Sequence, residues 1–168
     1  MLRPLNMESI VTFFAAASFV VIIFTDYLYY RIPNAVILFL MILTAVRLYL
    51  TSSPLPERIV SAIIVMGFLS LVNYYYEKRR NKQAIGFGDI KLLGILFLLY
   101  PLATSFAGLW LSALIALAGS LLLRLLIGRF RSDPRIPFGS FICATFLLIE
   151  LCNLQEPIEH FFLLYKGL

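Results

Sequence analysis

Long uncharged apolar stretches follow one another along almost the whole chain. Several are about 20 residues long, the length that an α-helix needs to cross the hydrocarbon of a membrane. Pro33 opens the second stretch, and Pro101, followed by small polar residues, divides the long stretch 90–128 into two helices, the first of them short. The pattern predicts six membrane spans, at residues 8–26, 33–49, 58–77, two within 90–128, and 136–152.

The composition agrees with a chain embedded in lipid. Of the 168 residues, 61% are hydrophobic and only 14% are charged, whereas soluble domains are about 45–50% apolar and about 25% charged. This balance excludes an ordinary soluble globule, and it excludes a disordered chain, which needs low hydrophobicity. We therefore expect an all-α fold, a polytopic membrane helix bundle with about six transmembrane helices, in a single domain over residues 1–168.

The basic residues gather on one side of the predicted bundle. The connections after the first, third and fifth spans hold ten of the fourteen Lys and Arg residues. Cytoplasmic loops carry such an excess, so we expect this side in the cytoplasm and both termini outside it. Because the net charge of +5 comes from short clusters, it indicates membrane lipid as a partner and no nucleic acid. The ten residues are Arg31, Lys78, Arg79, Arg80, Lys82, Lys91, Arg124, Arg129, Arg131 and Arg135.

The first span also has features of a secretion signal. Arg3 precedes the apolar run, and small residues stand at 15–18. Because the run continues well beyond these small residues, we expect an uncleaved membrane anchor.

Two aspartates stand where apolar spans end or begin. Asp26 closes the first span and Asp89 opens the fourth, and carboxylates within or beside a span cost about 2.5–3.5 kcal/mol on insertion scales. Taken singly, Asp26 is explained as an interfacial residue and Asp89 as the N-cap of a helix. The predicted topology places both at the cytoplasmic membrane face, where they can meet if the helices pack together. Gly86 and Gly88 before Asp89 let the backbone adopt positive φ and let a substrate chain approach closely.

Three motifs accompany the two aspartates. Ile-Pro-Asn follows Asp26 at 32–34, the segment 86–92 reads Gly-Phe-Gly-Asp-Ile-Lys-Leu, and Ile-Pro-Phe-Gly stands at 136–139 before the last span. With these motifs in this order, the chain from Asp26 to the last span resembles the type IV prepilin peptidase family of GxGD-type intramembrane aspartic proteases. Ser140 departs from the resemblance, because the family usually has proline at that place.

The resemblance implies an aspartic endopeptidase with Asp26 and Asp89 as its catalytic residues. The implied substrate is a prepilin or prepilin-like subunit of a type IV pilus or protein-secretion system, anchored in the same membrane. Its short basic leader would be removed at the cytoplasmic face of the inner membrane. Ser140 is not expected to be catalytic. We expect the other motif residues to position the substrate; they are Gly86, Gly88, Pro33, Asn34, Pro137, Phe138 and Gly139.

The two cysteines, Cys143 and Cys152, lie nine residues apart on one predicted span. Bifunctional members of the family carry two Cys-x-x-Cys pairs that bind zinc in a cytoplasmic insertion, and they also methylate the new pilin terminus. The spacing in this chain is not that of a zinc site. We expect a short form with no metal and no other cofactor, in which the cysteines fill apolar space or remain free thiols. Whether methyl transfer is retained stays open, as does the oligomeric state.

Two neighbouring carboxyl groups can hydrolyse a peptide bond because they cannot both ionise at low cost and therefore share one proton. The ionised group activates water while the protonated group polarises the carbonyl; the sequence does not tell which of Asp26 and Asp89 is ionised. An alternative is a proton-coupled small membrane transporter or channel subunit, although such proteins place their acids near the bilayer midplane. A structural subunit with no catalytic activity is a third possibility, in which the three motifs would be coincidental.

Other polar and small residues have packing roles in this interpretation. Arg47 and Glu150 should both lie at the outer membrane interface, where they can pair, and Lys91 should extend toward the interface. Small residues recur along the fifth span, and such stripes allow close contact between helices. They are Gly108, Ser112, Ala116, Gly119 and Ser120.

Overall fold

Helices account for nearly all of the part of the chain that the computed structural model describes, which is residues 7–51, 55–81, 83–127 and 137–166. No strand occurs in these ranges, so the all-α prediction is confirmed. In chain order the helices are α1 (Met7–Tyr29), α2 (Asn34–Thr51), α3 (Leu55–Arg80), α4 (Phe87–Leu99), α5 (Leu102–Ile127), α6 (Phe138–Leu151) and α7 (Gln155–Lys166).

The first six helices coincide with the six apolar segments of the sequence, including the break at Pro101. α7 is additional and was not predicted. Its 12 residues are too few for a span, and they mix polar with apolar side chains, so a search for long apolar runs misses it.

The number of membrane spans is smaller than the number of helices. Among the described residues, α1, α2, α3 and α5 are long and apolar enough to cross a membrane, and α6 with α7 pass the same test only as a pair bent by 91°. α4 has 13 residues and α6 has 14, which gives each about 20 Å of helix, less than the ~30 Å of the hydrocarbon core. The polytopic membrane helix bundle is confirmed, whereas the count of six spans is not.

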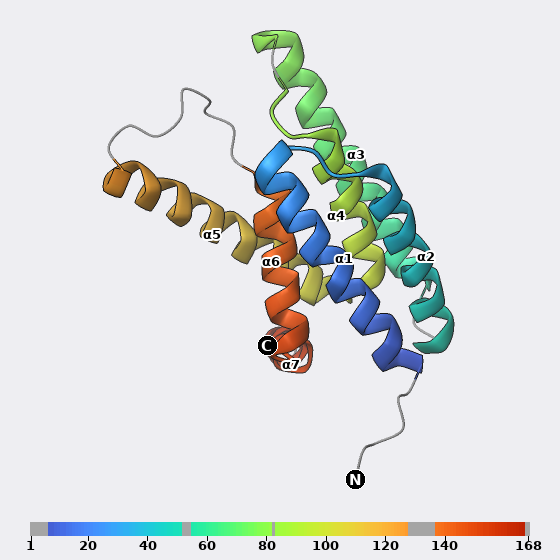
Figure 1. Cartoon of the computed structure of the whole chain (residues 1–168). Helices are drawn as coiled ribbons and strands as arrows, with labels where there is room; N and C mark the ends of the chain where they lie inside the picture. The colour runs from blue at the N-terminus through green and yellow to red at the C-terminus, as the bar shows by residue number, and fades with distance from the viewer. Residues whose placement is uncertain (1–6, 52–54, 82, 128–136, 167–168) are drawn as a thin grey trace.

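The first four helices run alternately up and down the bundle (Figure 1). α1 and α3 end at the upper end of the view, and α2, α4 and α6 begin there. α1 packs against α2 and α6, while α4 packs against α2, α3 and α6. α5 packs mainly against α6 and then points away from the other helices. The end of α1 and the beginnings of α4 and α6 therefore share one end of the molecule.

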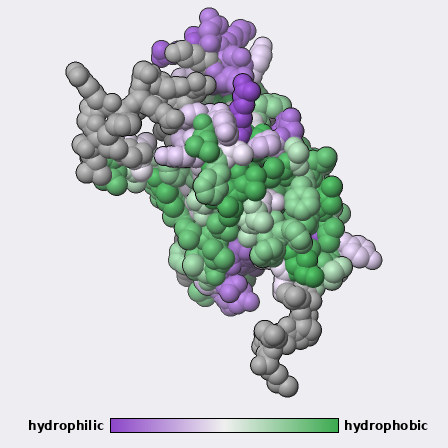
Figure 2. All heavy atoms as spheres, viewed as in Figure 1, coloured by the Kyte–Doolittle hydropathy of each residue, from purple (hydrophilic) through white to green (hydrophobic). Residues whose placement is uncertain are grey.

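The core is centred on α4. Nearly every side chain of this helix from Ile90 onward is buried. By contrast, α3 exposes apolar side chains such as Phe68, which is 65% exposed, and apolar surface covers the middle of the molecule (Figure 2). Outward-facing apolar side chains are expected where the surrounding solvent is lipid, because lipid tails are as apolar as the side chains themselves. The hydrophilic surface at the upper end of Figure 2 includes the basic last turn of α3.

Small residues let α5 approach α6 closely. A Cβ atom at Gly108 would lie 2.5 Å from Cζ of Phe146, so the aromatic ring occupies space that a side chain at 108 would need. Ser112 is fully buried and Ala116 is 5% exposed. Farther along α5, Gly119 lies beside Phe141. The stripe therefore has the packing role predicted from its spacing.

A buried ion pair lies at the end of the bundle opposite Asp26. Nη1 of Arg47 on α2 donates to Oε1 of Glu150 on α6 at 2.8 Å, and the two side chains are 18% and 5% exposed. Gln155, the first residue of α7, donates to the other carboxylate oxygen of Glu150. The predicted pairing of Arg47 with Glu150 is confirmed. Glu150 thus joins α2, α6 and α7 and holds the end of α6 in place.

Breaking this ion pair should destabilise the bundle. Arg47→Met leaves the Glu150 carboxylate buried without its cation, so the free energy of unfolding should fall by up to about 3 kcal/mol. Glu150→Gln should also destabilise, and the double variant should lose less than the sum of the two single losses. Thermal unfolding of the purified protein in detergent measures all three. Strictly additive losses would contradict the pairing.

Candidate active site

Asp26 and Asp89 converge on Gly139 from two different helices. Asp26 lies in the last turn of α1, Asp89 in the first turn of α4, and Gly139 in the first turn of α6. A Cβ atom at Gly139 would lie 2.8 Å from Oδ1 of Asp89 and 3.0 Å from Oδ2 of Asp26. The two oxygens are therefore no farther apart than the sum of these distances, 5.8 Å. A side chain at residue 139 would collide with both carboxyl groups, so their approach requires glycine at this position.

The first turn of α4 holds the Asp89 carboxyl group. The helix begins at Phe87 with Gly86 as its N-cap, so Asp89 is the third helical residue. The interpretation of Asp89 as an N-cap is therefore wrong by three positions. From the third position a carboxyl group can reach back to the N-cap amide, and the amides of Gly86 and Gly139 both lie against the Asp89 carboxyl group. These amides belong to the unpaired N–H groups that open a helix and favour negative charge.

Ser140 holds the Asp26 carboxyl group through two donors. Its backbone N–H donates to Oδ2 of Asp26 at 2.7 Å, and its hydroxyl group lies 3.1 Å from the same oxygen. The hydroxyl group also lies 3.1 Å from the carbonyl oxygen of Ile23. Asp26 is 6% exposed and Ser140 is 7% exposed. We did not expect Ser140 to take part in the site. It stands in the first turn of a predicted helix, where backbone N–H groups are unpaired, and this position could have indicated that it binds a carboxyl group.

The two glycines before Asp89 matter because they have no side chain. Gly86 has φ −63° and ψ 138°, and Gly88 does not lie in the positive-φ region either, so the expectation of positive φ is wrong. A Cβ atom at Gly86 would lie 3.2 Å from Oδ2 of Asp89, and one at Gly88 would lie 3.3 Å from Cβ of Ile32. Ile32 also reaches the Gly139 position, with its Cδ1 2.9 Å from a Cβ atom there. Gly86 thus leaves room for the Asp89 carboxyl group, and Gly88 leaves room for Ile32.

Pro33 and Asn34 connect the beginnings of α2 and α4. The carbonyl oxygen of Pro33 accepts hydrogen bonds from the amides that open α2, at 3.1 and 3.2 Å. Nζ of Lys91 donates to Oδ1 of Asn34 at 3.3 Å and lies 5.0 Å from the centre of the Phe87 ring. Pro33 therefore opens α2, and Asn34 links the beginning of α2 to that of α4.

The segment before α6 has a similar local role. Pro137 precedes the helix with φ −72° and ψ 76°, and its side chain offers no capping hydrogen bond. Phe138 is partly buried against the core. Within the described part of this motif, Gly139 is the residue that lies against both aspartates. Ile136 lies outside the described residues, as do Lys82, Arg129, Arg131, Arg135 and the side chain of Arg124.

The described residues contain no cluster of three His, Cys, Asp or Glu side chains that could hold a metal ion. Both cysteines are free; Cys143 is buried and Cys152 is exposed. Cys143 follows Gly139 by four residues, which is one turn of α6, so its thiol lies on the side of the aspartate pair that faces the core.

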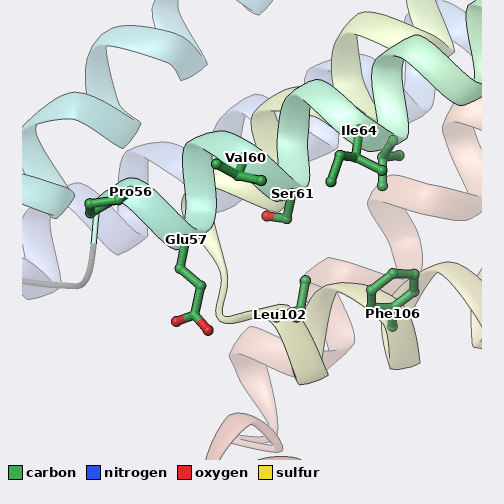
Figure 3. A pocket seen from close by; sticks show the side chains of 8 residues that line it. Pro56, Glu57, Val60, Ser61, Ile64, Leu102 and Phe106 are labelled. Carbon is green, nitrogen blue, oxygen red and sulfur yellow. The ribbon is translucent and has the colours of Figure 1, made fainter.

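A separate apolar groove of about 590 Å³ lies between α3 and α5. Figure 3 shows Val60 and Ile64 of α3 on one wall, with Leu102 and Phe106 of α5 on the other. The groove contains neither Asp26 nor Asp89. It is formed at the ends of these helices that lie away from the aspartate pair, so it is distinct from the candidate active site.

The sequence matches the model of the type IV leader peptidase family over residues 13–127. The matched stretch is more than half of the 168 residues and includes both Asp26 and Asp89. It ends before α6, so the segment that contributes Gly139 and Ser140 lies beyond it. No curated protein and no solved structure matches the chain.

A side chain at 139 should be costly. Gly139→Ala would place a methyl group within 3.0 Å of both carboxyl groups and of Ile32, and such overpacking destabilises by about 1–3 kcal/mol. Gly67→Ala on α3 is the matched control, because a Cβ atom there meets nothing within 4 Å and alanine favours helix. Thermal unfolding should show a loss for Gly139→Ala and none for Gly67→Ala. Equal behaviour of the two variants would contradict the close approach at Gly139.

Proposed function

This chain belongs to the type IV leader peptidase family, and on that premise we propose that it is an aspartic endopeptidase whose Asp26 and Asp89 hydrolyse a peptide bond. The observation that carries the proposal is the convergence of the two carboxyl groups on Gly139, with oxygens no more than 5.8 Å apart. Residues 63 positions apart in the sequence have no local reason to meet at one helix end. Their meeting in a mostly buried place is costly unless they share a proton and a task.

Hydrolysis by such a pair needs one proton between the two carboxyl groups. The ionised carboxylate takes a proton from water, and the water oxygen attacks the peptide carbonyl carbon. The protonated carboxyl group gives its proton to the carbonyl oxygen, which produces a tetrahedral diol. The first group then passes its proton to the departing nitrogen as the C–N bond breaks, and the second recovers its proton from the diol. The pair is thus restored after each turnover.

The substrate that fits is a prepilin or prepilin-like subunit held in the same membrane. The aspartate pair lies at the end of the bundle where α3 finishes with Lys78, Arg79 and Arg80. An excess of basic residues is typical of the cytoplasmic face, so we assign cleavage to the cytoplasmic face of the inner membrane. A short basic leader can reach this face in water while the apolar part of the substrate stays in lipid. A pair that shares one proton carries one negative charge, which favours a basic segment.

The approach to Asp89 is open on the side of Gly86. Gly86 is exposed and Phe87 is 59% exposed. We assign to Gly86 and Gly88 the task of leaving room for an extended substrate backbone beside Asp89. Pro33, Asn34, Pro137 and Phe138 support this site by placing the helix ends, and Gly139 leaves the space between the two carboxyl groups.

Asp26→Asn and Asp89→Asn should each reduce cleavage by at least about a thousandfold, because each removes one member of the acid–base pair. The measurement is coexpression with a prepilin, followed by the mobility shift that accompanies loss of the leader. Glu77→Gln on the exposed end of α3 is the matched control and should cleave normally. Turnover retained in either aspartate variant, at equal amounts of folded protein in the membrane, would overturn the proposal. The remaining interpretations of the protein would then be a proton-coupled transporter or a structural subunit.

Gly88→Val should reduce the turnover number by about a hundredfold. Its Cβ atom alone would lie 3.3 Å from Ile32, so the added methyl groups displace Ile32 or Asp89, and small misplacements at a reacting centre have effects of this size. Gly67→Val is the control, because position 67 has open space. Steady-state kinetics on a purified prepilin gives the comparison, and a normal turnover number for Gly88→Val would refute a role for this glycine.

A further inference from the structure

We propose that Ser140 decides which carboxyl group of the pair is ionised: its two donors hold Asp26 as the carboxylate that activates water, and the shared proton stays on Asp89. This inference rests on the proposed function, because it assigns roles within the same pair. Ser140 acts through Asp26 and is therefore a positioning residue.

One oxygen of Asp26, Oδ2, is shared between Ser140 and the Gly139 position. A Cβ atom at Gly139 would lie 3.0 Å from Oδ2 of Asp26 and 2.8 Å from Oδ1 of Asp89, so these are the oxygens by which the two carboxyl groups approach Gly139. Oδ2 is also the oxygen that accepts from the Ser140 amide at 2.7 Å and lies 3.1 Å from the Ser140 hydroxyl group. An oxygen that receives an N–H at this distance has to offer a lone pair toward it. A proton that the two carboxyl groups share is therefore better placed on Asp89.

The strength of these contacts follows from their burial. Hydrogen bonds to an ionised acceptor are about twice as strong as neutral ones, and the low dielectric of a buried site strengthens them further. Asp26 and Ser140 are 6% and 7% exposed. The Ser140 amide is also the third of the free N–H groups at the beginning of α6, where the helix dipole favours negative charge.

The donors at Asp89 are of a different kind. Its polar contacts are backbone amides of Gly86 and Gly139, and among the described residues no side chain donates a hydrogen bond to it. Asp26 therefore has a side-chain donor that Asp89 lacks. In the proposed reaction, Asp26 accepts the proton of water and Asp89 donates to the substrate carbonyl oxygen.

Few other charged or titratable groups lie on the elements packed around Asp26. α4 contributes Asp89 and Lys91, whose Nζ donates to Asn34, and α6 contributes the buried thiol of Cys143. The charged residue of α2, Arg47, pairs with Glu150 at the opposite end of the bundle. On the connection after α1, Arg31 is exposed. The hydroxyl group of Ser140 is thus the side-chain contact that distinguishes Asp26 from Asp89.

The test is the pH dependence of kcat/KM for prepilin cleavage by the purified protein in three variants at position 140. Ser140→Ala removes the hydroxyl group, Ser140→Pro removes both donors and is tolerated in the first turn of a helix, and Ser140→Thr keeps both. Weaker hydrogen bonds to the ionised carboxyl group of Asp26 move the acidic limb of the pH profile to higher pH. The shift should be about one pH unit for Ser140→Ala and larger for Ser140→Pro. Ser140→Thr should keep the original profile, and KM should change little in all three.

Ser112→Ala is the matched control, because this buried serine on α5 donates only to its own helix, at the carbonyl oxygen of Leu109. An acidic limb that stays in place in Ser140→Pro, or a shift that Ser112→Ala shows equally, would overturn the inference. Either result would leave the proposed function intact, because that depends on the loss of cleavage in Asp26→Asn and Asp89→Asn. Turnover in those aspartate variants would overturn the proposed function itself.

Discussion

The structure depends on the absence of a side chain at residue 139. Gly139 lies where the end of α1 and the beginnings of α4 and α6 meet, and both aspartates come within 3.0 Å of the position that its Cβ atom would occupy. Any side chain there would separate them. The close contact also fixes where two helices begin, because α4 and α6 have to start at the same level as the last turn of α1. Both are short and mostly buried, enclosed by longer helices that face the lipid.

The charges of the site are held by helix ends. Free amide groups at the beginnings of α4 and α6 supply donors to the two carboxyl groups: Gly86 and Gly139 to Asp89, and Ser140 to Asp26. Carboxylates within or beside a membrane span are costly, and such donors reduce that cost. At the other end of the bundle, Arg47 and Glu150 neutralise each other and fix α2 against α6. The two ends therefore stabilise buried charge differently, one by a cation and the other by backbone amides and a hydroxyl group.

Much of this arrangement could be predicted from the sequence. Apolar runs gave the positions of six helices, because lipid imposes a simple length and composition rule on each span, and basic loops placed Asp26 and Asp89 on one face. The rest depends on tertiary contacts. The beginning of α4 at Phe87 and the burial of α4 and α6 are set by neighbouring helices. Ser140 looks like an ordinary polar residue until α1 brings Asp26 within 2.7 Å of its amide.

The most direct test of the account is whether residues 26 and 89 meet in the native membrane. In a chain with Cys143 and Cys152 replaced by alanine, Asp26→Cys and Asp89→Cys can be joined by a short thiol-reactive cross-linker and detected by mass spectrometry of the peptides. The account predicts efficient intramolecular cross-linking of this pair and none for Asp26→Cys with Glu150→Cys, which lie at opposite ends of the bundle. If the first pair does not cross-link while each single cysteine reacts freely, the two acids do not share a site and the proposed chemistry is contradicted.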